Sequence, residues 1–326
     1  MILPDIKAAA SVLSLACLLS LPGPAEAQRV YRIGALVAED QFVPAFDGFK
    51  KRMAELGYLE DKNIRYDLYN AKGDLDTLEK MAQKLVQDKP DLIVTSSTTA
   101  TVPVAKRTTS LPVVFLSAGD PLRLVKSYAV SGNNLTGISS SSRDLMEKRV
   151  ELLKEIAPLM KRIIFLHYAA VKDYEAYQQL VRQAAKRLGL GLTEIQFRGQ
   201  NPAAVKEQVA LVTRDAGDGL LVPPEAPLTA LTEAIVQKSI KERLPSVGPN
   251  VQTVRKGYVA GYSSEYYALG QQGAMLVDKI LKGARPTDLP IELPSKLNLV
   301  INLKTAKAIG LKVPKEILVR ADEVIQ

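Results

Sequence analysis

Hydroxyl side chains gather in one short stretch of the sequence, where they could bind a small polar or anionic ligand. Residues 92–94 are apolar and have the composition of a buried strand. Five hydroxyl residues follow: Thr95, Ser96, Ser97, Thr98 and Thr99. A helix is predicted after them, over residues 100–107. Because N–H groups at a helix start favour a carboxylate or phosphate, the stretch predicts an anion site. The alternative is a helix cap and nothing more.

Polar and aromatic residues also lie in the turns after the other predicted strands. The candidate ligand contacts there are Phe42, Ser117, Asp120, Ser139, Tyr168, Glu225, Tyr262 and Glu265. Ligands of open parallel sheets bind at the carboxyl ends of the strands, so two facing sheets would bring these residues to one cleft. Structural roles stay open: Asp120 before Pro121 could cap a helix, Tyr262 could pack in a core, and Glu225 could be solvated.

The sequence offers few groups for catalysis. His167 is the only histidine, and its place at the end of an apolar run favours a buried imidazole. Cys17 is the only cysteine, which excludes a Cys/His nucleophile pair and a Cys- or His-rich metal site in the exported chain. No nucleophile elbow, phosphate loop or dinucleotide fingerprint is present. We therefore expect no enzyme, no cofactor and no metal, although a serine hydrolase using His167 stays open without support.

The N-terminus predicts export. Residues 8–21 are apolar, and Ala25-Glu26-Ala27 supplies small residues before Gln28, as in a secretory signal peptide spanning 1–27. Lipid anchoring at Cys17 is the less favoured alternative, because Ser14 occupies the position where a lipoprotein signal prefers leucine. Cleavage before Gln28 leaves no cysteine for a disulfide. The net charge of +8 is spread along the 326 residues and alternates with acidic residues, which argues against nucleic-acid binding.

Short apolar runs alternate with helical patterns throughout the remaining chain. The first series predicts strands at 30–37, 63–69, 91–94 and 112–116, and helices at 45–56, 75–87 and 100–107. The second predicts strands at 162–167, 190–196, 219–222, 245–247 and 258–262, and helices at 174–188, 202–214 and 228–242. A long helix (265–281), a proline-rich linker (286–294), a strand (297–302) and a short helix (304–309) follow. Such alternation predicts an α/β protein with parallel sheets in two lobes.

Several motifs then occur together in order. They are Gly-Tyr-Leu-Glu-Asp-Lys-Asn-Ile at 57–64, Val-Phe-Leu-Ser-Ala-Gly-Asp-Pro at 114–121, Asn-Leu-Thr-Gly-Ile-Ser at 134–139, Lys-Arg-Val-Glu-Leu-Leu-Lys-Glu at 148–155, Asn-Leu-Lys-Thr-Ala at 302–306 and Ala-Asp-Glu-Val-Ile at 321–325. The set resembles the ABC transporter substrate-binding protein family of the tryptophan/tyrosine type. The hydroxyl turn lies where that family has a small-residue turn, but Val102-Pro103 departs from its alanine-rich helix start.

The resemblance implies a two-lobed type I periplasmic-binding-protein fold, each lobe a parallel sheet flanked by helices, with three crossovers joining the lobes. The expected N-terminal lobe comprises residues 28–142 plus 263–288, and the expected C-terminal lobe residues 143–262 plus 289–326. Hinges are expected at 139–144, 261–264 and 286–294. The implied function is capture of a solute in the periplasm and its delivery to an ABC permease in the inner membrane, by a monomer that does no catalysis.

The expected ligand is an amino acid, an aromatic compound or another small carboxylate. Its carboxylate would bind the hydroxyls and N–H groups of residues 96–99, and Asp120, Glu225 or Glu265 would accept from an amine or hydroxyl. Phe42, Tyr168 and Tyr262 would flank an apolar part. The main alternative is a periplasmic sensor that presents its bound solute to a membrane signalling receptor.

Overall fold

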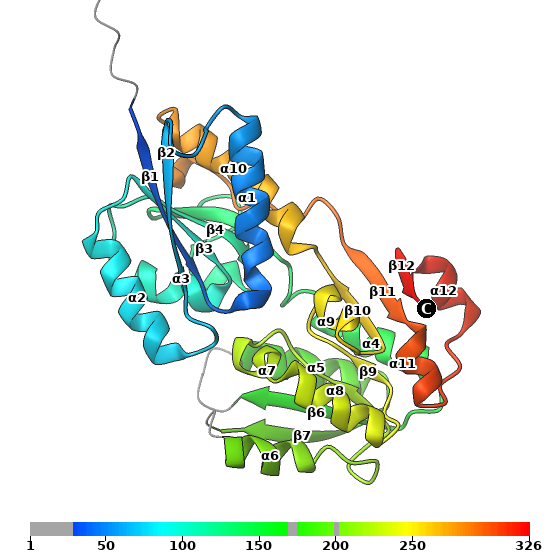
Figure 1. Cartoon of the computed structure of the whole chain (residues 1–326). Helices are drawn as coiled ribbons and strands as arrows, with labels where there is room; N and C mark the ends of the chain where they lie inside the picture. The colour runs from blue at the N-terminus through cyan, green and yellow to red at the C-terminus, as the bar shows by residue number, and fades with distance from the viewer. Residues whose placement is uncertain (1–28, 169–174, 199–201) are drawn as a thin grey trace, which may run out of the picture.

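Two α/β lobes make up the protein in the computed structural model, which describes residues 29–168, 175–198 and 202–326 (Figure 1). The expected signal peptide and Cys17 lie outside these residues. The first lobe contains a five-stranded sheet in which every pairing is parallel. Its strands, in spatial order, are β2 (Ile64–Asn70), β1 (Tyr31–Val37), β3 (Leu92–Ser96), β4 (Val113–Ala118) and β5 (Leu135–Ser139).

The second lobe repeats this strand order and extends it. Its seven strands, in spatial order, are β12 (Glu323–Ile325), β11 (Asn298–Asn302), β10 (Ala260–Ser263), β9 (Ser246–Val247), β8 (Gly219–Leu221), β6 (Arg162–Tyr168) and β7 (Gly191–Phe197). Strands β6 to β10 thus have the 2-1-3-4-5 arrangement of β1 to β5. The expectation of a parallel sheet fails at one pairing, because β11 runs antiparallel to β10.

Helices flank both sheets. The first lobe has the 3-10 helices η1 (Asp40–Phe42) and η2 (Pro121–Arg123) and the helices α1 (Val43–Glu55), α2 (Leu75–Gln87), α3 (Thr98–Ala105) and α10 (Tyr266–Leu281). The second has α4 (Met146–Ile156), α5 (Glu175–Arg187), α6 (Pro202–Ala210), α7 (Ala226–Ala230), α8 (Thr232–Lys241), α9 (Val251–Arg255), α11 (Leu303–Ala308) and α12 (Lys315–Arg320). Helix α10 returns to the first lobe and packs against α1, where Gly270 leaves room for the carbonyl of Ala45.

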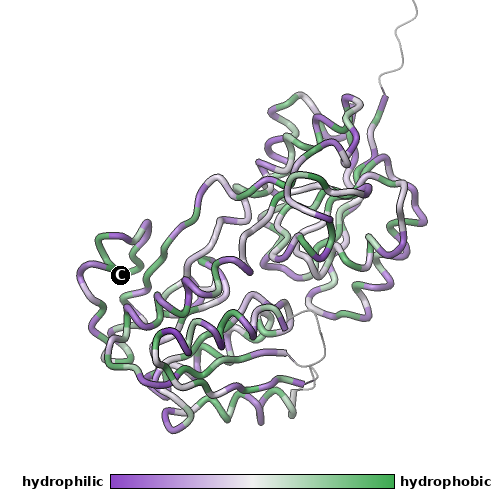
Figure 2. Tube along the Cα trace, turned by 180° about the vertical axis from the view of Figure 1, so that it is seen from behind, coloured by the Kyte–Doolittle hydropathy of each residue, from purple (hydrophilic) through white to green (hydrophobic). Residues whose placement is uncertain are grey.

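Each lobe has its own hydrophobic core. Phe49, Phe115 and Leu276 belong to the first core, and Phe165, Phe197 and Leu220 to the second. Hydrophobic segments follow the strands inside each lobe, and hydrophilic residues recur along the outer helices (Figure 2). Because a parallel strand is covered on both faces, such strands are apolar along their length, which is why the sequence revealed them.

Three crossovers join the lobes, between β5 and α4, between β10 and α10, and between the 3-10 helix η4 (Pro286–Asp288) and β11. The third was expected as a plain linker, yet it first adds to the first sheet. Glu292 N donates to Gly137 O at 3.0 Å, and Ser139 N donates to Glu292 O at 2.8 Å. The first two crossovers contact each other, since Ser264 Oγ donates to Ser140 O at 3.4 Å. This arrangement is the type I periplasmic-binding-protein fold.

Two predicted helices were wrong in detail, and one helix was missed. The predicted helix 228–242 is two helices, α7 and α8, and at their junction Thr232 Oγ1 donates to Thr229 O at 2.7 Å. A hydroxyl that bonds a nearby carbonyl competes with the helical pattern, which the apolar spacing does not reveal. The predicted helix 202–214 ends earlier, at Ala210. Helix α9, which Asn250 caps by accepting from Thr253 N, was not predicted.

Candidate ligand-binding site

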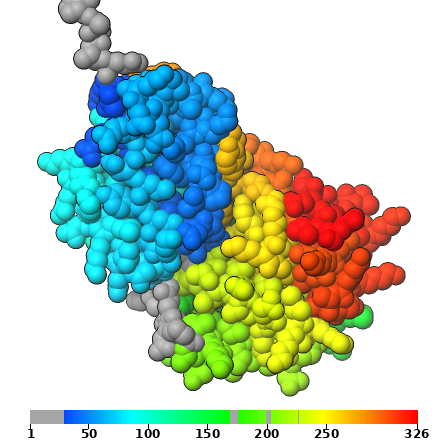
Figure 3. All heavy atoms as spheres, in the orientation of Figure 1, coloured from blue at the N-terminus to red at the C-terminus, as the bar shows by residue number. Residues whose placement is uncertain are grey.

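A cavity lies where the two lobes meet. The space free of protein atoms there is about 440 Å³, a figure that includes open solvent, and both lobes contribute to the walls. The lining residues are Phe42, Ser97, Thr98, Thr99, Ser117, Gly119, Asp120, Arg123, Ser140, Ser142, Tyr177, Pro224 and Tyr266. In space-filling view the first lobe, in blue and cyan, rests directly on the green and yellow surface of the second (Figure 3). The cavity therefore lies between the lobes.

The wall from the first lobe is an interlocked set of hydroxyls. Ser97 has φ 85° and ψ 153°, an uncommon conformation for a residue other than glycine. Its Oγ accepts from Ala100 N at 3.1 Å and thereby caps α3, while its own N–H donates to Ser117 Oγ at 3.2 Å. Backbone strain at a ligand-facing turn is a feature of functional sites, because the surrounding bonds must hold it in place.

Asp120 lies at the end of this wall and is only 4% exposed. Its N–H donates to Thr98 Oγ1 at 3.1 Å, which ties the turn after β4 to the turn after β3. Its Oδ1 accepts from Arg143 Nη1 at 3.1 Å, and Arg143 belongs to the first crossover. Asp120 is therefore a buried carboxylate whose position is fixed from two sides, not a helix cap, since no side-chain cap bond is formed there.

Aromatic rings form the apolar part of the cavity. The rings of Phe42 and Tyr266 are 4.9 Å apart between centroids and inclined by 51°. Tyr177 contributes a third ring from α5 of the second lobe. Asn250 Nδ2 donates to Tyr266 Oη at 3.4 Å and to Gln41 Oε1 at 2.7 Å, which joins α9 of the second lobe to the segment before α1. Burial raises the pKa of Tyr266, so its phenol is neutral at physiological pH.

Half of the expected contacts line the cavity and half do not. Those that line it are Phe42, Ser97, Thr98, Thr99, Ser117 and Asp120. Those that do not are Ser96, Ser139, Tyr168, Glu225, Tyr262 and Glu265. Ser96 Oγ is buried and has no hydrogen-bond partner among the described residues, and Ser139 Oγ accepts from Ser141 N at 2.9 Å.

Tyr262 and Glu265 make contacts outside the cavity. Tyr262 packs against the second core and lines a separate pocket with Leu299 and Arg320. Glu265 accepts from Arg255 Nη2 at 2.9 Å and from Gln252 Nε2 at 2.8 Å. The strand and helix around them were predicted correctly, but which side of β10 faces the cavity depends on packing between elements.

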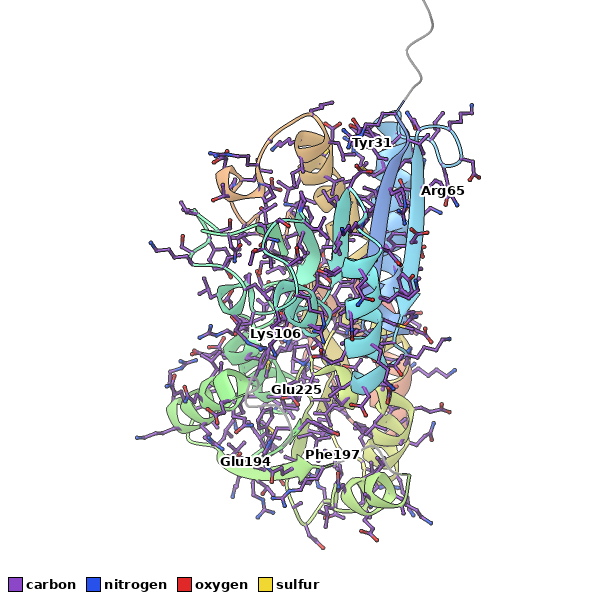
Figure 4. All side chains as sticks on the ribbon, turned by 90° about the vertical axis from the view of Figure 1, so that its left-hand side faces the viewer. Tyr31, Arg65, Lys106, Glu194, Phe197 and Glu225 are labelled. Atoms are coloured by element: carbon purple, nitrogen blue, oxygen red, sulfur yellow. The ribbon has the colours of Figure 1, made fainter. Side chains whose placement is uncertain are left out.

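Glu225 lies behind the cavity wall and is fully buried. Its Oε2 accepts from Tyr168 N at 2.7 Å, and its Oε1 has no hydrogen-bond partner among the described residues. Burial raises the pKa of Glu225 well above its ordinary value. Its neighbour Pro224 lines the cavity, and Glu225 lies at the junction of the lobes in Figure 4, whereas Glu194 and Phe197 lie in the sheet of the second lobe.

The sequence missed seven lining residues: Gly119, Arg123, Ser140, Ser142, Tyr177, Pro224 and Tyr266. The run of four serines at 139–142 was a usable signal for two of them, because it follows the Asn-x-Thr-Gly-x-Ser motif directly. Tyr177 had no such signal, since a tyrosine on an amphipathic helix looks like a core residue.

Metal sites and membrane-spanning helices are both absent from the part of the chain that the structure describes. It contains no group of three histidine, cysteine, aspartate or glutamate side chains placed to bind a metal ion. Within the same residues, every helix is too short or too polar to cross a membrane.

Proteins of similar sequence or structure include known substrate-binding proteins. A tyrosine-binding protein of Clostridioides difficile (strain R20291) is 25% identical over 287 residues, covering 87% of this chain and 82% of the relative. A crystal structure of an ABC domain from Streptococcus pneumoniae in complex with L-Trp has a TM-score of 0.82 at 26% identity, covering 91% of this chain and all of that one. A ligand-free, open substrate-binding protein from Clostridium difficile, at 25% identity and the same coverage, has a lower TM-score of 0.67.

The family assignment rests on nearly the whole described chain. The family described as ABC transporter substrate binding protein matches residues 32–325, which include both lobes and all three crossovers. The match agrees with the fold, with the cavity between the lobes, and with the ordered motifs in the sequence. This chain belongs to the ABC transporter substrate binding protein family.

Proposed function

We propose that this protein binds an aromatic amino acid between its lobes and delivers it to an ABC permease. The observation that carries the proposal is the cavity itself, which combines three aromatic rings with six hydroxyl side chains and the buried carboxylate of Asp120. Ligand pockets of this kind use apolar walls for affinity and a few placed polar groups for orientation. The relatives that bind tyrosine and L-Trp support this ligand class.

The cavity residues divide into three roles in this proposal. Phe42, Tyr177 and Tyr266 contact the ring of the ligand. The hydroxyls of Thr98, Thr99 and Ser117 bond its polar groups, with Ser97 holding the turn in place. Asp120 and Glu225 accept from the ligand ammonium, and Tyr168 orients Glu225 through its N–H. We assign Ser96 and Ser139 supporting positions, and Tyr262 and Glu265 no ligand contact in this arrangement.

Closure of the lobes couples binding to transport in this proposal. Only the closed arrangement contacts the ligand from both sides, so binding shifts the protein towards it. The crossovers at 139–144, 261–264 and 286–294 would bend as hinges. The higher TM-score to the L-Trp complex than to the open structure supports a closed arrangement here. We further propose that residues 1–27 direct export and that the protein acts as a monomer in the periplasm.

A ligand panel tests the proposal directly. The purified protein is mixed with aromatic and aliphatic amino acids, purines and small carboxylates, and its thermal midpoint is measured. A ligand at 100 times its dissociation constant adds about 2.7 kcal/mol to the free energy of unfolding. We expect L-tryptophan or L-tyrosine to raise the midpoint by about 4 °C for a chain of this size, given an unfolding entropy of about 2.1 cal/mol/K per residue. A shift with another class alone would contradict the proposed ligand.

A matched pair of variants then locates the binding site. Thr98→Val removes a hydroxyl from the cavity wall but keeps a side chain of nearly the same size. We expect the affinity for the amino acid to fall roughly 3- to 10-fold. Thr193→Val makes the same change in the second lobe, where Thr193 Oγ1 donates to Ala216 O and does not line the cavity. Calorimetric titration should give the wild-type affinity for Thr193→Val. Equal losses in both variants would place the ligand elsewhere.

A further inference from the structure

Arg149 is a cation buried without an acidic partner. It lies on α4 in the second lobe, and its side chain is 0% exposed. Among the described residues, no carboxylate lies within ion-pair distance of its guanidinium, unlike Arg143 or Arg187. Burial lowers the pKa of Arg149 to about 10, so the group is still charged at neutral pH.

Backbone carbonyls hold this guanidinium in a fixed orientation. Nε donates to Tyr262 O at 3.1 Å, and Nη1 donates to Ser142 O at 3.0 Å, so the group bridges the first two crossovers. Nη2 is buried and has no hydrogen-bond partner among the described residues. Carbonyl dipoles solvate a cation in part, but a buried charge ordinarily requires a counter-charge.

Arg149 does not itself line the cavity, but residues that interact with its guanidinium do. Ser142, whose carbonyl accepts from Nη1, lines the cavity. The phenols of Tyr177 and Tyr266, which also line it, are the groups whose electrostatic interaction with Arg149 raises its pKa. The cation is therefore directly behind the wall that the second lobe, the first crossover and α10 form together.

The turn after β3, which was expected to bind the ligand carboxylate, has fewer free donors than the sequence indicated. The N–H groups of Ser97, Ala100 and Thr101 already donate, to Ser117 Oγ, Ser97 Oγ and Ser97 O. A carboxylate bonded to these three N–H groups would compete with the bonds that form the turn.

We propose that Arg149 recognises the anionic group of the ligand and so gives the cavity its selectivity for carboxylates. The inference rests on the proposed function, since it assigns one pole of an amino-acid ligand. The carboxylate approaches the side of the cavity formed by Ser142, Tyr177 and Tyr266. Its charge supplies the counter-charge that Arg149 does not have within the described protein. The ammonium then lies towards the carboxylates of Asp120 and Glu225.

A competing role for Arg149 is purely structural. By bonding Ser142 O and Tyr262 O, it could fix the relative positions of two crossovers and do nothing else. A structural tie would affect every ligand equally. An anion-recognising group would affect only ligands that carry the anion, and this difference decides between the two roles.

The test is a thermodynamic cycle over the protein and the ligand. L-Tryptophan and L-tyrosine are compared with their α-carboxamides, which keep the ring and the ammonium but remove the negative charge. Each is titrated into wild type, Arg149→Met and Arg149→Lys. The control is Arg187→Met, because Arg187 is 51% exposed and pairs with Glu147 on the outside of the same lobe.

We expect wild type to bind the acids roughly 10- to 100-fold more tightly than the amides, as for a hydrogen bond to a charged group. Arg149→Met should lose most of this ratio while its amide affinity changes little. Arg149→Lys should keep part of the ratio, because it retains the charge without the planar fork. Arg187→Met should match wild type.

Three results would overturn the inference. If Arg149→Met weakened the binding of acids and amides by the same factor, Arg149 would have only the structural role. Equal affinity of wild type for acids and amides would exclude anion recognition, and this result needs no folded variant. A wild-type protein that binds neither acids nor amides would overturn the proposed function, and the inference with it.

Discussion

The turns after β3 and β8 occupy the same place in the two lobes but are built differently. Each follows the third strand of a 2-1-3-4-5 sheet. After β3, Ser97 Oγ caps its own helix by accepting from Ala100 N. After β8, Glu225 stands at the same position before α7 but makes no cap bond. It accepts instead from Tyr168 N of the neighbouring strand, and its Oε1 stays unpartnered within the described residues.

This difference separates a turn held by a side-chain cap from one whose carboxyl bonds a neighbouring strand instead. In the hydroxyl turn the N–H groups of Ser97, Ala100 and Thr101 donate to Ser117 Oγ, Ser97 Oγ and Ser97 O. The Glu225 turn and Arg149 each keep a buried polar atom that has no hydrogen-bond partner among the described residues, and we propose that the ligand satisfies these atoms. In the proposed binding mode, Asp120 of the first lobe and Arg149 and Glu225 of the second lobe together select the ligand.

The largest expected effect concerns Glu39, the buried carboxyl of the first lobe. Burial raises the pKa of Glu39 from 4.5 to about 8, although Gln41 Nε2 donates to it. Because the folded state binds the proton more tightly, Glu39 contributes stability that is present below pH 4.5 and is lost as the pH rises through about 8. One pKa unit corresponds to about 1.4 kcal/mol. Denaturant melts over this pH range should show a stability loss of several kcal/mol.

Glu39→Gln should flatten this pH profile. Glu225 also has a raised pKa and contributes a loss of the same sign, so the variant should reduce the slope without abolishing it. The control is Glu207→Gln, an exposed carboxyl in the second lobe. A Glu39→Gln profile that runs parallel to wild type would show that Glu39 is ionised when folded.

The second effect tests the charge on the Glu225 turn. Glu225→Gln keeps the acceptor for Tyr168 N but removes the carboxyl group, which can ionise when it meets the ligand ammonium. We expect the affinity for an aromatic amino acid to fall roughly 10- to 100-fold, as for a lost hydrogen bond to a charged group. Calorimetry measures this. The unliganded variant should be at least as stable as wild type above neutral pH, because a carboxylate no longer has to be buried. Unchanged affinity would mean that Glu225 does not bind the ammonium.

A smaller effect tests the hydroxyl turn. Ser97→Ala removes the helix cap at a positive φ and should lower the free energy of unfolding by about 1–2 kcal/mol. Ser97→Gly also removes the cap, but glycine adopts this positive φ without strain. Its free energy of unfolding should therefore fall by only roughly a few tenths of a kcal/mol. Chemical denaturation compares the two. A glycine variant less stable than the alanine variant would contradict the strained conformation.

The smallest effect concerns closure of the lobes over Gly119. A Cβ at this position would lie 2.9 Å from Tyr177 Oη of the opposite lobe. The tyrosine tip can move, so Gly119→Ala should weaken binding only about threefold, or about 0.6 kcal/mol. Titration with the preferred amino acid measures the change. Tighter binding in Gly119→Ala would show that the lobes do not approach each other at this point when the ligand binds.

Much of the fold could be predicted because its signals are local. The buried strands are apolar throughout, and α2 was predicted with its observed bounds, since its apolar stripe and Asp74 cap lie within a few residues. The family resemblance added the crossovers, which leave little local trace. The split between α7 and α8 was missed because it depends on hydroxyl bonding, not on apolar spacing.

The sequence predicted the site residues only where the site is formed by the turns that follow the strands. Ser97, Thr98, Ser117 and Asp120 follow apolar strands, so their position was readable from the sequence. Tyr177 reaches the cavity from a helix of the opposite lobe, and its role depends on how the lobes meet. Arg149 lay inside a motif that was noticed, yet nothing in the sequence showed that it is buried without an acidic partner.

Binding of L-tryptophan followed by its own fluorescence tests the central claim most directly. The chain contains no tryptophan, so the indole of the ligand is the only one in the sample. We predict saturable binding of one ligand per chain, with an emission shift to shorter wavelength as the indole leaves water, weakened in both Thr98→Val and Glu225→Gln. L-Tyrosine should compete if the protein prefers it. An indole emission that stays unchanged, with no protection by L-tyrosine in thermal melts, would contradict the account.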